Sequence, residues 1–85
     1  MYNISIPNKK VMNKLESYIQ QRESIREKLD SLKENPRKNC GAHPLKGKLE
    51  GKWACWLGSN IRTMYIIDDL NEIIIITAVG THKIY

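Results

Sequence analysis

The sequence predicts an α+β domain in which an N-terminal helical hairpin packs on one face of a three- or four-stranded antiparallel sheet. Three observations predict this fold. Apolar residues recur at helical spacing through residues 11–32, three segments rich in β-branched and aromatic residues follow residue 51, and short turns separate these segments. With 85 residues, the chain is long enough for one domain, residues 1–85, with a modest core.

The first half is predicted to hold a short strand and two helices. Residues 3–6, which precede a proline, indicate an edge strand. The apolar positions of the helical stripe are Val11, Leu15, Tyr18, Ile25, Leu29 and Leu32. Ser24 and Glu27 fit a capping box, which favours a second helix starting there. One long helix remains the alternative, because residues 20–23 contain no Gly or Pro. Asn35-Pro36 ends the helical pattern.

The second half is predicted to form the sheet. A loop rich in glycine spans residues 39–51, and strands follow at residues 52–57, 61–67 and 72–79. The connections between these strands are short, so neighbouring strands should be antiparallel. If both helices cover one face of the sheet, the opposite face is available as a functional site.

The positive charge is concentrated in the middle third of the chain. The net charge is +5, and the segment from Pro36 to Arg62 contains six basic residues and a single acid, Glu50. The basic residues are Arg37, Lys38, Lys46, Lys48, Lys52 and Arg62. The remainder of the chain has eight basic and eight acidic residues. A local surplus of this kind suits a polyphosphate or an acidic protein partner, although a solvated basic loop would have the same composition.

Other features exclude several classes of protein. No segment approaches the roughly 20 apolar residues needed to cross a bilayer, and the N-terminus lacks a secretory pattern. We therefore expect a soluble, cytoplasmic protein. Cys40 and Cys55 lack CxxC spacing and are expected to be reduced thiols. Even with His43 they would supply only three metal ligands, so no metal or other cofactor is expected.

Strand alternation assigns residues to the two faces of the predicted sheet. Lys52 and Trp56 fall on one face, while Trp53 and Cys55 fall on the face expected under the helices. Trp56 would then stack on a nucleic-acid base or cover the sheet edge. Arg62 lies in an apolar strand, where a guanidinium needs an anionic or carbonyl partner. A phosphate or a structural ion pair would each meet that need.

The residues after the last predicted strand include two candidates for chemistry. Gly80 allows the backbone to turn, so that His82 and Tyr85 could fold back over the sheet. An imidazole exchanges protons near neutral pH, which suits general acid–base catalysis. On the sequence alone, a solvated histidine is the more common outcome at such a position.

Four motifs, in matching order and spacing, resemble the RelE/ParE toxin superfamily and especially its YafQ-like branch. They are HPLKG at 43–47, LEGKW at 49–53, IRTMY at 61–65 and VGTH at 79–82. The resemblance covers residues 29–85, and the N-terminal part is similar only as a helical hairpin. It implies a RelE-like fold and the toxin of a type II toxin–antitoxin system. Such a toxin is a ribosome-dependent endoribonuclease that cuts mRNA without a metal, by attack of the RNA 2′-OH on the adjacent phosphate.

The resemblance also implies roles for particular residues. Arg62 would stabilise the charge on the phosphate, His82 would act as a general acid or base, and Tyr85 would orient or stack on a nucleotide. His43 corresponds to a further histidine of the YafQ-like branch. The residues expected to bind RNA are Arg37, Lys38, Lys46, Lys48, Lys52 and Trp56. The implied partners are the ribosome, mRNA and an acidic antitoxin, with the toxin monomeric alone and in a hetero-oligomer with its antitoxin.

The chain departs from the YafQ-like pattern at three positions. Ala54, Trp56 and Asn60 stand where that branch has an acid, a histidine and a second acid, and Tyr85 aligns with a one-residue gap. If the missing groups supply the base in that branch, His43 or His82 must do so here. Two alternatives therefore stay open: a ParE-like inhibitor of DNA gyrase without nuclease activity, and a catalytically weakened member that still binds antitoxin.

Overall fold

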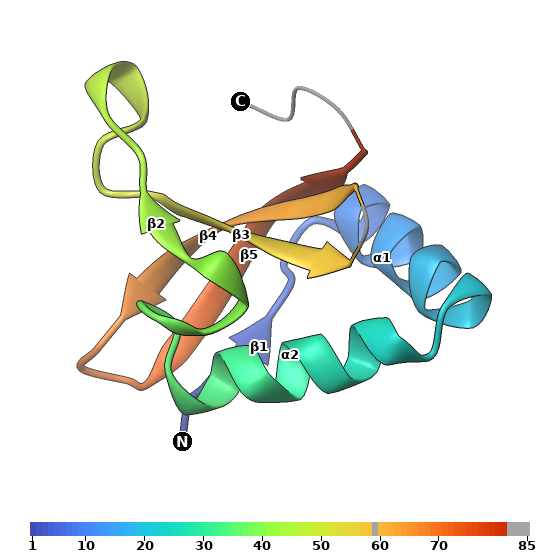
Figure 1. Cartoon of the computed structure of the whole chain (residues 1–85). Helices are drawn as coiled ribbons and strands as arrows, with labels where there is room; N and C mark the ends of the chain where they lie inside the picture. Colours follow the sequence, from blue (N-terminus) through green and yellow to red (C-terminus); the bar gives the residue numbers. More distant parts are fainter. Residues whose placement is uncertain (59, 82–85) are drawn as a thin grey trace.

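The computed structural model describes residues 1–58 and 60–81. The elements run in the order β1 (Asn3–Ser5), α1 (Lys9–Gln21), α2 (Ser24–Glu34), β2 (His43–Pro44), β3 (Trp53–Gly58), β4 (Ile61–Asp68) and β5 (Ile73–Gly80). Two short 3-10 turns, η1 (Asn39–Gly41) and η2 (Gly47–Leu49), flank β2. Both helices pack on the same side of one sheet (Figure 1). The predicted α+β class and helix placement are confirmed.

The sheet has five strands in the order β1-β5-β4-β3-β2. The β2–β3, β3–β4 and β4–β5 pairs are antiparallel, whereas β1 runs parallel to β5. The strand count exceeds the predicted three or four because of β2. This two-residue strand, which contains a proline, forms only by pairing His43 with Ala54 and Pro44 with Trp53.

The helical hairpin is confirmed, although its second helix starts differently from the prediction. Helix α1 is capped by the Asn8 side chain, which accepts a hydrogen bond from the Val11 amide at 3.1 Å. Helix α2 begins at Ser24, but no side-chain capping bond forms there. The preceding Glu23 is already in helical conformation, so the tight turn from Arg22 runs directly into the helix. In the described ranges, no helix is long and apolar enough to cross a membrane.

The main core lies between the helices and the sheet. Its helical members are Leu15, Ile25, Leu29 and Leu32, and its sheet members are Cys55, Leu57, Ile61, Tyr65, Ile74, Ile76 and Val79. Trp53 packs against this core, so the predicted assignment of β3 faces holds. The Tyr65 hydroxyl is buried and donates to the Pro36 carbonyl at 2.6 Å, which ties the end of the hairpin to the sheet.

The sheet face opposite the helices, hereafter the open face, carries a second and smaller core. Leu45, Ala54 and Met64 are buried there, with Leu49 and Ala78 packed against them. The expectation that this face is left free was therefore partly wrong. Its centre is covered because the segment between β2 and β3 folds back over it through Leu45 and Leu49.

Candidate functional site

An arginine and a tryptophan stack at one end of the open face. Trp56 on β3 is the cross-strand partner of Arg62 on β4, and Arg62 is the partner of Gly80 on β5. The Arg62 guanidinium carbon lies 4.3 Å from the centroid of the Trp56 ring. This distance is well within the range of an attractive cation–π interaction. The tryptophan is 39% exposed, so solvent or a ligand reaches it from the open face.

The next row of the sheet brings His43 to the same face. His43 is paired with Ala54, which precedes Trp56 by two residues on β3, so the side chains of His43 and Trp56 project from the same face. The imidazole is exposed, and its Nδ1 lies 3.2 Å from the Gly41 carbonyl oxygen. Ala54 is buried together with Leu45 and Met64, which is its cross-strand partner.

Two exposed lysines occupy the loop between β2 and β3. The Leu45 amide donates to the Lys52 carbonyl at 2.9 Å, and the Lys52 amide donates to the Leu49 carbonyl at 3.0 Å. These bonds close the loop, and the side chains of Leu45 and Leu49 anchor it on the open face. Lys46 and Lys48 are exposed on this loop, while Lys52 is half-buried at its base. In Figure 1 the loop extends on the side away from both helices.

Arg37 lies apart from this constellation. Its guanidinium forms a two-pronged ion pair with Asp69, with nitrogen–oxygen distances of 2.7 and 3.0 Å. The Tyr2 hydroxyl also donates to Asp69 at 2.6 Å. Arg37, with help from Tyr2, lowers the pKa of Asp69 to about 2. Arg37 also lies over Trp53, whose side chain packs on the helix side. Lys38, its neighbour, is exposed.

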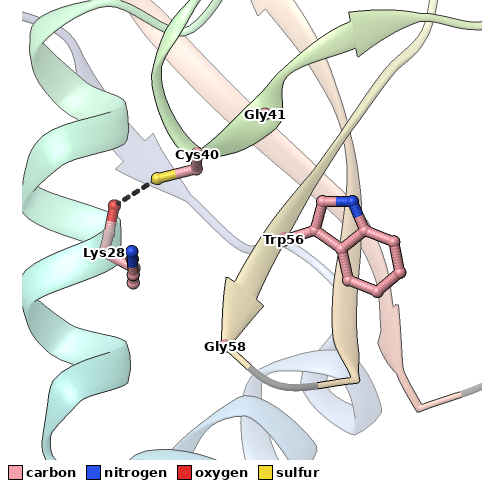
Figure 2. Close-up of a pocket in the computed structure, with 5 residues that line it drawn as sticks. All are labelled: Lys28, Cys40, Gly41, Trp56 and Gly58. Atoms are coloured by element: carbon pink, nitrogen blue, oxygen red, sulfur yellow. Dashed lines mark hydrogen bonds between the residues drawn. The ribbon is translucent and has the colours of Figure 1, made fainter.

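A pocket of about 500 Å³ adjoins Trp56, and the sequence carried no motif for it. Its lining residues are Lys28, Cys40, Gly41, Trp56 and Gly58 (Figure 2). The Cys40 thiol donates to the Lys28 carbonyl at 3.2 Å, and burial raises the pKa of that thiol. Cys40 adopts a left-handed backbone conformation with φ of 61°, which is uncommon for a residue with a side chain. The two glycines were the available signal for a close approach of chain segments.

The structure accounts for only part of the predicted site. Arg62, Trp56 and His43 share the open face, and Lys46, Lys48 and Lys52 lie on the loop that covers part of it. Asn60, which replaces a family acid, is exposed beside the β3–β4 turn. His82 and Tyr85 lie outside the described residues. The strand that leads to them ends at Gly80, opposite Arg62.

Comparison with known proteins identifies solved structures of toxins. No protein-family profile matches the sequence, and no curated protein sequence does so. A YoeB/ParE toxin from Agrobacterium tumefaciens matches with a TM-score of 0.74 at 16% identity, covering 94% of this chain and 98% of that one. The isolated RelE toxin of E. coli matches with a TM-score of 0.73 at 18% identity, covering 100% and 88%.

A structure of the YoeB–YefM complex from Staphylococcus aureus has a TM-score of 0.72 at 24% identity and covers 96% of this chain and 98% of that one. These matches span nearly the whole of both chains, so they concern the complete fold and not a shared hairpin. They do not single out the YafQ-like branch within the superfamily. The protein thus has the fold of the RelE/ParE toxins.

Proposed function

We propose that this protein is the toxin of a type II toxin–antitoxin system and acts as a ribosome-dependent endoribonuclease on mRNA. The observation that carries the proposal is the Arg62–Trp56 stack on the open face of a fold shared with toxins. A loop with exposed lysines lies at the other end of β3, next to Lys52. A cation and an aromatic ring side by side are what a strand of RNA requires, one for its phosphates and one for its bases.

In the proposed reaction the RNA supplies its own nucleophile. The 2′ oxygen of one nucleotide attacks the adjacent phosphorus, and the bond from phosphorus to the 5′ oxygen of the next nucleotide breaks. A cyclic phosphate and a 5′-OH result. A base takes the proton from the 2′-OH and an acid gives one to the departing 5′ oxygen. The protein must also stabilise the added negative charge on the phosphate in the transition state.

Arg62 is the residue proposed to stabilise that charge. A guanidinium has a planar fork of donors that matches phosphate oxygens, and stacking on an aromatic ring engages its face and not the donors in its plane. The Trp56 ring therefore supports Arg62 in an orientation that is compatible with phosphate binding. Lys46, Lys48 and Lys52 would bind phosphates along the strand.

His82 is proposed as the acid or base, with Tyr85 orienting the nucleotide and His43 as the second proton-transfer group. Gly80 is the cross-strand partner of Arg62, and this pairing supports the choice of His82, two residues further along the sequence. The His43 imidazole reaches the same face from β2.

The partner that restrains such a toxin would be an acidic antitoxin. The S. aureus structure, in which YoeB is bound to YefM, provides the precedent for a bound antitoxin. Here the surplus positive charge between Pro36 and Arg62 would attract acidic side chains.

The test is induction of the protein in growing bacteria, with the first process to stop measured directly. We expect translation to halt and messages to be cut, and His82→Ala to relieve both while its urea unfolding midpoint stays unchanged. Lys9→Ala, which removes an exposed charge at the start of α1, is the control and should leave the arrest intact. Loss of DNA supercoiling before any message is cut would identify a gyrase inhibitor and overturn the proposal.

A further inference from the structure

The pocket beside Trp56, here called the α2–β3 pocket, belongs to no role assigned so far. It lies between helix α2, which contributes Lys28, and strand β3, which contributes Trp56 and Gly58. In Figure 2, Lys28 and Cys40 lie on the α2 side, with Gly41 next to Cys40, while Trp56 and Gly58 lie on β3. Trp56 therefore borders both the Arg62 stack and this pocket.

The charge of the pocket favours an anionic ligand. Lys28 is exposed and takes part in none of the ion pairs formed within residues 1–58 and 60–81. Within those same ranges no acidic side chain lines the pocket. An ammonium group at the rim of an aromatic pocket binds a phosphate as a compact charge with three donors.

The size of the pocket suits a ligand as large as a single nucleotide. Its volume of about 500 Å³ lies within the range of small-molecule sites, roughly 300–1,000 Å³. Gly41 has φ of 66°, and a Cβ added there would lie 3.2 Å from Cδ1 of Trp56. The absence of a side chain at Gly41 thus lets the backbone lie against the indole. Gly58 has φ of 142°, and a Cβ added there would lie in open space.

The edge of β3 adds hydrogen-bonding groups. Within the described part of the chain, β2 pairs with β3 at Trp53 and Ala54 alone. The β3 edge beyond Ala54 therefore continues past the end of β2, on the side where η1 and the pocket lie. The η1 turn packs against this part of β3, and backbone groups at a strand edge can form hydrogen bonds with a ligand that reaches them.

We infer that the α2–β3 pocket is a subsite for one nucleotide of single-stranded RNA, next to the nucleotide whose phosphate meets Arg62. Lys28 binds its phosphate, and its base lies in the pocket against Trp56. The inference deepens the proposed endoribonuclease function and rests on it, because that function is what brings an RNA strand to Arg62. Binding of RNA at the pocket is nevertheless measurable without any cleavage. The inference gives helix α2 a role in RNA binding through Lys28, which lies outside the loop that carries Lys46 and Lys48.

Cys40 provides a direct reporter of occupancy. It lines the pocket and is half-buried, whereas Cys55 is 1% exposed and burial raises the pKa of its thiol to about 12. A maleimide should therefore label Cys40 first. The probe is a short single-stranded RNA with 2′-O-methyl groups, which binds but cannot be cut by its own 2′-OH. We expect saturating probe to slow Cys40 labelling at least several-fold, as followed by mass spectrometry.

The matched variants are Lys28→Ala in the pocket and Lys14→Ala on the exposed side of α1. Lys28→Ala should weaken binding of the probe several-fold and reduce the dependence of log K on log salt by about 0.7, the loss of one contact to a single strand. Lys14→Ala should change neither, and Lys28→Arg should restore most of the affinity.

Failure of the inference can be told apart from failure of the proposed function. If the protein cuts messages but the probe leaves Cys40 labelling unchanged, or if Lys28→Ala and Lys14→Ala behave alike, the subsite is wrong and the nuclease stands. If Cys40 is protected and Lys28 is required for binding but no message is ever cut, the subsite stands and the nuclease does not. Absence of any binding of the probe overturns the subsite.

Discussion

Two arginine–tryptophan contacts flank strand β3, and they differ in what the guanidinium does. Arg37 lies 5.8 Å from the ring centroid of Trp53 and holds Asp69 with both terminal nitrogens. Arg62 lies closer to its tryptophan, 4.3 Å from the centroid of Trp56. Trp53 and Trp56 are an odd number of positions apart, so their side chains project from opposite faces of the strand.

The difference is between an arginine whose ion pair joins distant parts of the fold and one that we propose for a substrate phosphate. The Arg37–Asp69 ion pair joins the segment after the helical hairpin to the β4–β5 turn. Asp69 also accepts a hydrogen bond from Tyr2, which lies next to β1. Its donor fork is committed to a carboxylate. Arg62 stacks on an aromatic ring on the open face, where the same chemistry would serve a phosphate. Residue type and net charge alone do not distinguish the two.

The largest effect is expected from exchanging the two arginines for alanine separately. Arg62→Ala should lower the rate of message cleavage about 10²–10³-fold, the usual cost of removing a group that stabilises transition-state charge, and Arg62→Lys should restore only part of it. Arg37→Ala should leave cleavage unchanged and lower the thermal midpoint. Cleavage by purified protein on translating ribosomes and thermal unfolding measure the two effects. Equal loss of cleavage in both variants would remove the distinction between the arginines.

The next effect concerns the tryptophans. Trp56→Ala should reduce cleavage about tenfold, because base stacking contributes roughly 1–3 kcal/mol and support for Arg62 is lost as well. Trp56→Tyr, which keeps an aromatic face, should recover most of the activity. Trp53→Ala should instead destabilise the fold by less than the roughly 3–5 kcal/mol of a fully buried tryptophan. Urea unfolding separates the two classes of variant, and a Trp56→Ala protein that is chiefly destabilised would contradict the assignment.

The smallest effect is the pH dependence of the stability that the Arg37–Asp69 ion pair contributes. Asp69 has a pKa of about 2 in the folded protein against about 3.9 in an unfolded chain. The folded state therefore favours the ionised carboxylate, so this stabilisation is present above about pH 4 and is lost as the pH falls toward 2. Asp69→Asn should flatten the fall in urea midpoint over that window. Asp30→Asn, at another exposed carboxylate, serves as the comparison and should leave the fall in place. A wild-type midpoint that does not fall between pH 4 and 2 would show that the Arg37 pair adds nothing to stability.

Periodicity predicted those parts of the fold that depend on local pattern. The apolar stripe from Val11 to Leu32 predicted both helices, and alternation along residues 52–57 assigned Trp53 and Trp56 to the correct faces. Both patterns are informative because apolar residues that repeat every 3.6 residues lie on one face of a helix, and those that repeat every 2 residues lie on one face of a strand. The roles of Arg62 and His82 came instead from the resemblance to a family.

Features that depend on contacts distant in sequence were not predictable. Strand β2 has only two residues, one of them a proline, and exists because β3 pairs with it. Leu45 and Leu49 were read as part of a loop, yet they seal the second core. The ion pair of Arg37 was not predicted, because its partner Asp69 lies 32 residues away in the sequence. The α2–β3 pocket combines residues from α2, η1 and β3, and no single segment shows it.

The parallel pairing of β1 with β5 has a consequence for synthesis of the protein. Asn3, Ile4 and Ser5 pair with Ile73, Ile74 and Ile75, and β5 lies between β1 and β4 in the sheet. A nascent chain thus lacks an inner strand of its sheet until residues 73–75 have been made. Folding that waits for such non-local contacts is slow and late. The open face therefore forms only after β5, which lies between β1 and β4, has been synthesised.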